Sequence, residues 1–245
     1  MLIILFFFVY IKYNIFIMMS EKQKKVKNIF WSLVYLALAT VIIVSAASMF
    51  NNFYYESVYV SGSSMSPTFD GNTGTRLGSD YGIIDKDSGA KRNVKRFQIV
   101  TTYYPSDYQN YGTEDQKLLD TATYKIKRVL VKPGETFKVE DNKIFIKGKE
   151  GYGDPLDIPF IRHGIEDESK EEAHRNWPET TLNNSQYFLA GDNWVHSSDS
   201  FSIGPIDYQL LVGVVVKMQG KCTVVDGKVV EKEPYADRYF LGVNY

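Results

Sequence analysis

Residues 123–147 read TYKIKRVLVKPGETFKVEDNKIFIK, and their pattern is informative about the fold class. Apolar and polar residues alternate over short runs, as they do in strands with one buried face. Pro133-Gly134 and Asp141-Asn142 separate the runs with residues that favour tight turns, and the second pair is typical of a hairpin. The stretch therefore predicts three strands, Thr123–Val131, Thr136–Glu140 and Lys143–Lys147.

The same alternation continues on both sides of this stretch. Together with 18 tyrosines and 15 phenylalanines it predicts a mainly β fold built on antiparallel sheet. The other strands expected are Ser57–Val60, Gly82–Asp85, Phe97–Tyr103, Gln186–Ala190, Leu210–Met218 and Cys222–Val225, with a hairpin turn at Asp226-Gly227 leading to Lys228–Val230. Glu150–Asn184 is charged and irregular, with a short helix expected near Glu168–Ala173. We interpret about 141–185 as an insertion that forms a small cap.

The N-terminal part predicts a membrane anchor. Ile29–Phe50 carries no charge and is long enough to cross a hydrocarbon core of about 30 Å as a helix. The segment before it, EKQKKVK at 21–27, contains four lysines, so the positive-inside rule puts residues 1–28 in the cytoplasm. We expect a single-pass protein of the plasma membrane, in contact with lipid, whose residues 51–245 form an extracytoplasmic domain.

Two alternatives concern this N-terminal part. Ser45-Ala46-Ala47 has the small residues of a signal-peptide cleavage site, but the apolar run exceeds the usual h-region of about 7–15 residues, which favours a retained anchor. Residues 1–17 are also hydrophobic and are interrupted by Lys12. They are either a second span or an upstream extension of a chain that begins at Met18 or Met19.

Composition argues against several classes of protein. The chain has 28 Lys+Arg and 29 Asp+Glu, and its net charge of -1 gives no electrostatic basis for binding nucleic acid. Its one cysteine, Cys222, allows neither an intrachain disulfide nor a thiolate metal cluster, and we expect it to be a small buried residue. The 3 histidines are scattered, so we expect no metal and no cofactor.

Three polar segments contain the candidate chemistry. They are SGSSMSPT at 61–68, YKIKRVLVKPGE at 124–135 and GDNWVHSSDS at 191–200. Each alone has a structural explanation, because Ser/Gly/Pro loops are usually solvated turns and strand lysines usually face solvent. In this order, behind one anchor, they resemble the serine, lysine and G-D-N boxes of bacterial type I signal peptidases. RFQIV at 96–100 is a weaker match to that family's R-G-D-I-V box.

The resemblance and the chemistry both point to a Ser/Lys dyad. Ser64, directly before Met65, takes the nucleophile's position, and a serine hydroxyl needs a nearby base to accept its proton. A lysine can be that base if burial lowers its pKa from about 10.4 towards 7–8. Lys127 fits the lysine box. Lys125 lies on the same strand face and is the rival candidate, but the Arg128 that follows Lys127 in the motif favours Lys127.

Further roles follow only from the resemblance. Ser197 would hydrogen-bond the Lys127 amine, and Asp199 would stabilise the third segment. The backbone N–H of Ser64 would meet the oxyanion, and Gly62 stands where some relatives offer a side-chain hydroxyl. The residues expected to bind substrate are Met65, Phe69, Lys125 and Ile126.

His196 offers an alternative to the lysine. A Ser–His–Asp triad can be drawn from Ser64, His196 and Asp199. The family leaves the position of His196 variable, however, so we interpret it as an exposed loop histidine.

The surroundings of the dyad depart from the family pattern. Trp194 and Phe201 stand where arginines are usual, and the second arginine normally pairs with the equivalent of Asp199, which therefore needs another partner here. Phe97-Gln98 replaces Gly-Asp, and Val131 replaces Gly or Ala. These departures favour a peptidase dedicated to few substrates, such as pilus subunits, over a housekeeping enzyme.

We therefore expect a membrane-anchored serine endopeptidase that removes signal peptides from exported preproteins after small residues. The substrate would bind extended, as an added strand beside Lys125–Val129. One alternative is a catalytically silent relative that acts as an assembly factor or chaperone for secreted or pilus proteins. The other is a soluble self-cleaving repressor-type protein with the same dyad, against which the anchor argues.

Overall fold

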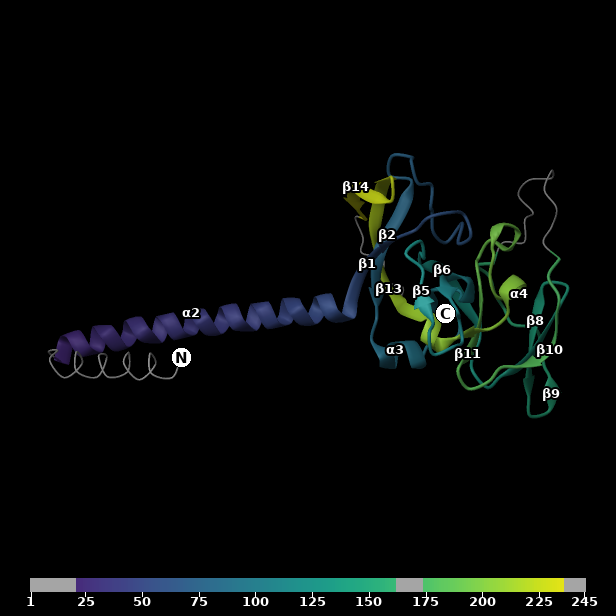
Figure 1. Ribbon diagram of the computed structural model, residues 1–245, viewed down its shortest axis with the longest axis horizontal. Coiled ribbons are helices and arrows are strands. Elements are labelled where there is room, and N and C mark those ends of the chain that lie inside the picture. The colour runs from purple at the N-terminus through teal and green to yellow at the C-terminus, as the bar shows by residue number, and fades with distance from the viewer. Residues whose placement is uncertain (1–20, 162–173, 236–245) are drawn as a thin grey trace. The chain divides into compact units, whose positions relative to one another are not determined.

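The computed structural model describes residues 21–161 and 174–235 of the chain (Figure 1). The chain divides into two compact units, Met1–Asn52 and Phe53–Tyr245. The expectations for residues 1–17 and for a helix near Glu168–Ala173 lie outside the described residues.

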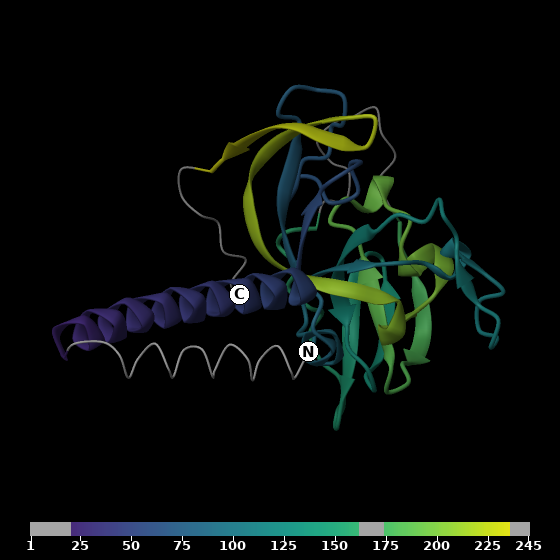
Figure 2. The same cartoon turned by 60° about the vertical axis from the view of Figure 1, so that its left-hand side comes forward.

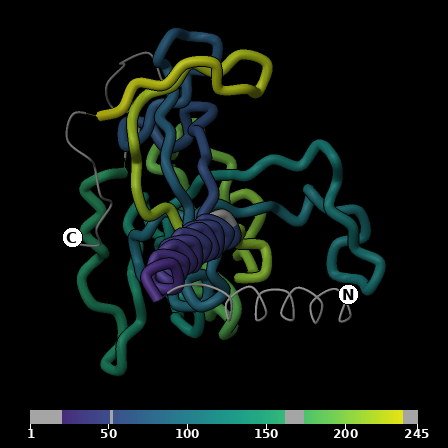
Figure 3. The backbone as a smooth tube through the Cα atoms, turned by 90° about the vertical axis from the view of Figure 1, so that its left-hand side faces the viewer, coloured from purple at the N-terminus to yellow at the C-terminus, as the bar shows by residue number. Residues whose placement is uncertain are grey.

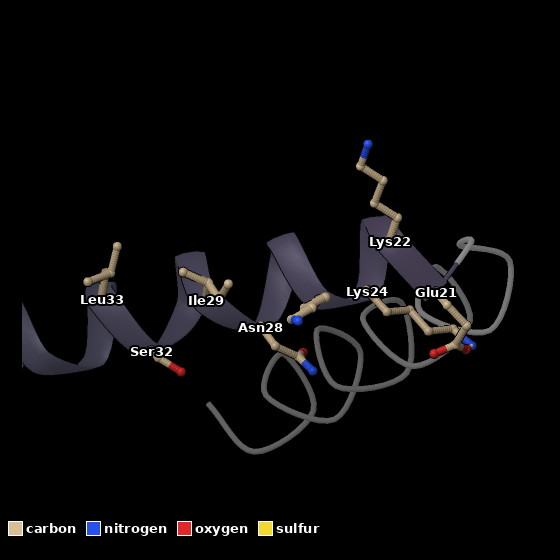
Figure 4. Close-up of a pocket in the computed structure, with 8 residues that line it drawn as sticks. Glu21, Lys22, Lys24, Asn28, Ile29, Ser32 and Leu33 are labelled. Atoms are coloured by element: carbon tan, nitrogen blue, oxygen red, sulfur yellow. Dashed lines mark hydrogen bonds and ion pairs between the residues drawn. The ribbon is translucent and has the colours of Figure 1, made fainter.

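Helix α2 (Glu21–Tyr54) is continuous over 34 residues. Its Glu21–Phe50 part is long and apolar enough to cross a membrane, and its apolar side chains are exposed on all sides. Figure 4 shows its first turns, where Lys22, Lys24 and Asn28 precede Ile29 and Leu33 beside an open hollow. A helix that is apolar all round suits a bilayer better than water.

The second unit is mainly β (Figure 2), which confirms the predicted fold class. Its largest sheet has 8 strands in the order β1-β2-β13-β3-β6-β11-β12, with β14 paired to β13 and every pair antiparallel. The strands are β1 (Tyr55–Tyr59), β2 (Ser79–Asp85), β3 (Ile99–Thr102), β6 (Lys125–Val131), β11 (Gln186–Ala190), β12 (Ile206–Asp207), β13 (Leu211–Val225) and β14 (Lys228–Pro234).

The described residues of this unit also form two smaller sheets. One has the order β10-β7-β8-β9 and consists of β7 (Thr136–Glu140), β8 (Lys143–Gly148), β9 (Gly151–Tyr152) and β10 (Trp177–Thr181). The other is the hairpin of β4 (Tyr108–Gln109) and β5 (Lys117–Leu118), which projects from the large sheet (Figure 3). The short helices are α3 (Ser88–Arg92), η1 (Pro105–Asp107), η2 (Trp194–His196), α4 (Ser200–Ile203) and η3 (Tyr208–Leu210).

Both predicted hairpin turns are confirmed. Asp141 and Asn142 have φ of 46° and 64°, and Asp226 and Gly227 have φ of 49° and 73°. Positive φ at both central residues is the requirement of a type I′ turn, whose twist matches that of the flanking strands. The two turns therefore set the register of β7 with β8 and of β13 with β14.

The prediction of two strands, Leu210–Met218 and Cys222–Val225, is wrong because the chain is continuously extended in β13. The pairing of β13 with β2 shifts between Val215 and Lys217 and again between Met218 and Gly220, which breaks the apolar alternation without ending the strand. Gly220 is required at the second shift, since a Cβ there would lie 2.1 Å from the carbonyl oxygen of Glu233.

The expectation that Glu150–Asn184 is irregular is wrong at β9, which pairs with β8, and at β10, which pairs with β7. The region also contributes to the core. Leu182 is buried in one cluster with Phe137 and Ile144 of the second sheet and with Leu130 and Phe188 of the large sheet. The two sheets therefore share a core, and strand pairing with β7 orders a segment whose own composition favours a loop.

Candidate active site

Ser64 lies on the loop between β1 and β2, and glycines close the base of that loop. The N–H of Gly62 donates to the carbonyl of Gly71 at 2.9 Å, and Gly62 has φ of 84°. A Cβ on Gly71 would lie 2.2 Å from the carbonyl oxygen of Gly62, so only glycine permits this approach. The side chains of Met65 and Phe69 hold the loop on the core, where both are buried against β2, β3 and β13.

The loop brings Ser64 to Lys127 of strand β6. The distance between Ser64 Oγ and Lys127 Nζ is 2.9 Å, and Nζ also donates to the carbonyl of Ile126 at 3.0 Å. This is hydrogen-bonding distance for a base that is to accept the hydroxyl proton of a serine. The structure thus joins two residues that are 63 positions apart in the sequence.

Lys127 is only 4% exposed. Burial lowers its pKa to about 8, since removal from water disfavours the ammonium form. The carboxylates of Asp199 and Asp192 oppose this shift, while the cations of Lys125 and Arg175 add to it. A substantial fraction of Lys127 is therefore neutral at mildly alkaline pH and able to accept a proton.

Lys125, the rival base, is held in an ion pair. Its Nζ lies 2.7 and 2.8 Å from the two carboxylate oxygens of Asp107 and donates to the carbonyl of Thr123 at 2.9 Å. Lys125 lines the same cleft as Ser64 but is bound to Asp107 rather than to the hydroxyl.

A buried ion pair ties the three polar segments together. Arg128 Nε and Nη2 donate to the two carboxylate oxygens of Asp192 at 2.7 and 2.6 Å, and both side chains are almost fully buried. Thr68 Oγ1 donates to the same carboxylate, and Arg128 Nη1 donates to the carbonyl of Phe97. Residues of the serine loop, β6 and the third segment are thereby fixed to one another, in the bidentate geometry that arginine provides.

The third segment also contacts the serine loop through its backbone. The N–H of Asn193 donates to the carbonyl of Ser64 at 3.0 Å. A Cβ on Gly191 would lie 2.3 Å from that carbonyl oxygen and 2.4 Å from Ser197 Oγ. Ser197 Oγ accepts from the N–H of Gly191 at 3.2 Å, and within the described part of the chain no hydrogen bond joins it to Lys127.

Asp199 has the partner that the sequence left unidentified. Its Oδ1 accepts from Arg175 Nη1 at 2.6 Å, and its Oδ2 accepts from the N–H of Gly191 at 3.0 Å. Arg175 comes just before β10, in the region expected to be a cap. The sequence showed that Asp199 lacks its usual arginine, but nothing near Arg175 marked it as the replacement.

His196 does not form a triad. Its side chain is exposed, and among the described residues it has no hydrogen bond to Ser64 or Asp199. The described residues also contain no cluster of three or more histidine, cysteine, aspartate or glutamate side chains able to hold a metal ion.

A cleft of about 410 Å³ opens beside Ser64 and Lys127, between β1 and the first residues of β6. Ser64, Lys127 and three of the four predicted substrate-binding residues, Met65, Lys125 and Ile126, line it. The fourth, Phe69, lies in the core cluster beneath the loop. Gly62 does not line the cleft, and its N–H closes the base of the loop by donating to the carbonyl of Gly71. Tyr124 and Glu56, which sequence reasoning missed, also line the cleft, and the Tyr124 hydroxyl donates to the Glu56 carboxylate at 3.2 Å.

The sheet edges beside the cleft are open to a further strand. In the described structure β1 pairs with β2 on one side only. β6 pairs with β3 along Lys125–Arg128, but β11 covers its other edge only from Arg128 onwards. An extended peptide can therefore approach the backbone of Lys125–Lys127 from the cleft.

Comparison with known proteins gives consistent matches. The family model described as signal peptidase, peptidase S26, matches residues 33–219. Signal peptidase I V of Bacillus subtilis (strain 168) is 30% identical over 184 residues, covering 73% of this chain and 94% of that protein. Signal peptidase I of Bacillus amyloliquefaciens is 26% identical over 198 residues, covering 79% and 88%. A crystal structure of a signal peptidase I from Enterococcus faecalis V583 aligns with a TM-score of 0.36 and 22% identity, over 50% of this chain and 97% of that one.

Proposed function

The chain belongs to the signal peptidase family, peptidase S26, and on that premise we propose that Ser64 is its nucleophile and Lys127 its general base. Membership makes it a serine endopeptidase that removes signal peptides. The observation that best supports this dyad is the 2.9 Å distance between Ser64 Oγ and the buried Lys127 Nζ.

The reaction begins with neutral Lys127. Ser64 Oγ attacks the scissile carbonyl carbon while Lys127 Nζ takes the hydroxyl proton, which it then gives to the leaving amine. Among the described residues no group accepts from the N–H of Ser64, which leaves this donor available to the oxyanion. Water, deprotonated by the same amine, then hydrolyses the acyl ester and releases the signal peptide.

The substrate binds as an extended strand in the cleft. The free edge that supports this proposal is Lys125–Lys127, shorter than the Lys125–Val129 expected from sequence, because β11 covers β6 from Arg128 onwards. Tyr124 precedes Lys127 by three positions, about 10 Å along a strand. The cleft thus receives about three residues before the Tyr124–Glu56 contact, and its small volume suits the small side chains at the cleavage site.

Helix α2 anchors the enzyme in the plasma membrane as a single span. Its uncharged segment and the lysines before it support an orientation with the second unit outside the cell. The aromatic residues at 194 and 201 favour a peptidase dedicated to few substrates, of which pilus subunits are one class.

Alanine substitution tests the dyad. Full-length Ser64→Ala and Lys127→Ala, in lipid vesicles with a preprotein that has an Ala-x-Ala site, should each lose all detectable cleavage. Ser63→Ala is the matched control and should keep cleaving. Lys125→Ala tests the rival base and should keep detectable cleavage even if substrate binding weakens. Full cleavage activity of either Ser64→Ala or Lys127→Ala would contradict the proposal. Wild-type protein that cleaves nothing, while its deletion still blocks export of a partner, would favour the silent chaperone instead.

A further inference from the structure

We propose that Arg175 is a positioning residue for the proposed dyad, holding the third segment, residues 191–200, against Ser64 and Lys127. The inference rests on the proposed function, because it assigns Arg175 a role in the reaction and not only in folding.

Arg175 makes three hydrogen bonds to the third segment. Nη1 donates to Asp199 Oδ1 at 2.6 Å, and Nη2 donates to the carbonyls of Trp194 and Ser197, the latter at 2.9 Å. The guanidinium carbon also lies 4.7 Å from the ring centre of Phe201 and 5.5 Å from that of Trp194. One planar group therefore fixes both ends of the turn that contains Ser197.

The surroundings of the Arg175 side chain suit a guanidinium group. The side chain of Arg175 is 12% exposed and that of Asp199 is fully buried, so the carboxylate depends on this cation. Loss of one partner from such a buried pair leaves an uncompensated charge. A lysine has a single nitrogen and cannot reproduce a planar fork stacked on two rings.

The contacts continue from Arg175 to the nucleophile. The N–H of Gly191 is shared by Asp199 Oδ2 and Ser197 Oγ, the two side chains of the turn that Arg175 holds. Gly191 itself packs on the carbonyl of Ser64, with no room for a Cβ. A shift of the turn would therefore move Ser64 relative to Lys127.

Arg175 also balances the charges around the base. Those that face Lys127 are Asp199, Asp192, Lys125 and Arg175. The negative charge of Asp192 is balanced by its ion pair with Arg128, and the positive charge of Lys125 by its ion pair with Asp107. Removal of Arg175 would leave the negative charge of Asp199 unopposed and raise the pKa of Lys127.

The test compares Arg175→Met with Arg175→Lys in the full-length protein, measuring kcat, KM and the pH dependence of kcat/KM. For Arg175→Met we expect kcat to fall by about 10- to 100-fold with little change in KM, as misplacement of a reacting group does. The increase of its kcat/KM with pH should occur at higher pH than in the wild type. Arg175→Lys should lower kcat. Its kcat/KM should still increase near the wild-type pH, because the positive charge remains.

Two further variants separate positioning from simple destabilisation. Arg96→Met is the matched control, since Arg96 is also partly buried, pairs with Glu135 and bonds the Leu130 carbonyl, away from the third segment. It should leave the pH profile unchanged. In Arg175→Met/Asp199→Asn the increase of kcat/KM with pH should move back down, to or below its wild-type pH, because Asp199 raises the pKa of Lys127 more than Arg175 lowers it, while kcat stays low.

A wild-type kcat and pH profile in Arg175→Met would overturn the inference. So would equal losses in Arg175→Met and Arg96→Met that follow their melting temperatures. Failure of the dyad itself is distinguishable, because it would appear as cleavage by Ser64→Ala whatever happens at Arg175.

Discussion

At Lys127, burial works against the charge that a lysine normally carries. The pKa falls from 10.5 to about 8, so the folded protein binds fewer protons than the unfolded chain between these two pH values. The free energy of unfolding contributed by this residue therefore rises with pH from about 8 to about 10.5. Below pH 8 the site carries a stability cost of roughly 3 kcal/mol, at 1.36 kcal/mol per pKa unit.

Lys127→Met should remove this cost. We expect the variant to be more stable than wild type near pH 7 by up to roughly 3 kcal/mol, with the difference shrinking as pH rises through 8 to 10.5. Urea unfolding at several pH values measures this difference. A difference that does not depend on pH would mean that Lys127 is not desolvated as the structure indicates.

The two residues of the proposed dyad lie in segments that the sequence singles out, whereas the contacts around them were not predictable. Ser64 and Lys127 lie in segments whose order resembles a known pattern. The pairing of Lys125 with Asp107 and of Asp199 with Arg175 depends on tertiary contacts between segments 18 and 24 residues apart. Phe97 shows the same limit, since its φ of 69° explains why glycine is usual there, but the sequence alone gave no sign that this conformation is retained with a phenylalanine.

At the scale of elements, the Arg128–Asp192 pair joins strand β6 to the third segment. Arg128→Leu leaves a fully buried carboxylate without its cation, so we expect a loss of about 3–5 kcal/mol in the free energy of unfolding. Arg76→Ala is the control, because Arg76 pairs with Glu231 at the surface, where solvent screens the pair, and should change stability far less. Equal effects of the two variants in urea unfolding would contradict a structural role for the buried pair.

The contact between Tyr124 and Glu56 joins the two walls of the cleft. Tyr124→Phe removes the hydroxyl and keeps the ring, which should widen the end of the cleft. We expect kcat/KM to rise by about tenfold for substrates with a bulky side chain three or four residues before the cut, relative to small ones. Peptides that vary only at that position measure this preference.

Tyr59→Phe is the matched control for this prediction. Tyr59 lines the same cleft, but its hydroxyl donates to the carbonyl of Gly227. The substrate preference of this variant should match that of wild type. An unchanged preference in Tyr124→Phe would show that the contact does not limit the cleft.

Strands and hairpin turns were largely evident from the sequence because each depends on residues close together in the chain. Thr136–Glu140 and Gln186–Ala190 have the predicted bounds, and the Asp141-Asn142 turn has the expected backbone. Strand β10 was missed because its order comes from pairing with β7 across about 40 residues. The continuity of β13 was missed because bulges interrupt its alternation.

For the whole molecule, the proposal combines a membrane span with a β unit outside the cell. The full-length protein should remain with membranes after alkaline carbonate extraction, and deletion of residues 1–52 should release it. Protease added outside intact protoplasts should degrade the second unit and spare an N-terminal fragment. Protection of the second unit under these conditions would reverse the orientation predicted by the lysines at 22–27.

The pH dependence of kcat/KM in the full-length enzyme is the most direct measurement of the Ser64–Lys127 mechanism. In the proposed mechanism a neutral Lys127 accepts the serine proton, so the rate should rise with pH and level off above an apparent pKa near 8. In Lys127→Ala the rise should disappear together with the activity, while Ser63→Ala should retain both. A rise centred near 6.5, the usual value for histidine, or one that persists in Lys127→Ala would contradict lysine as the base.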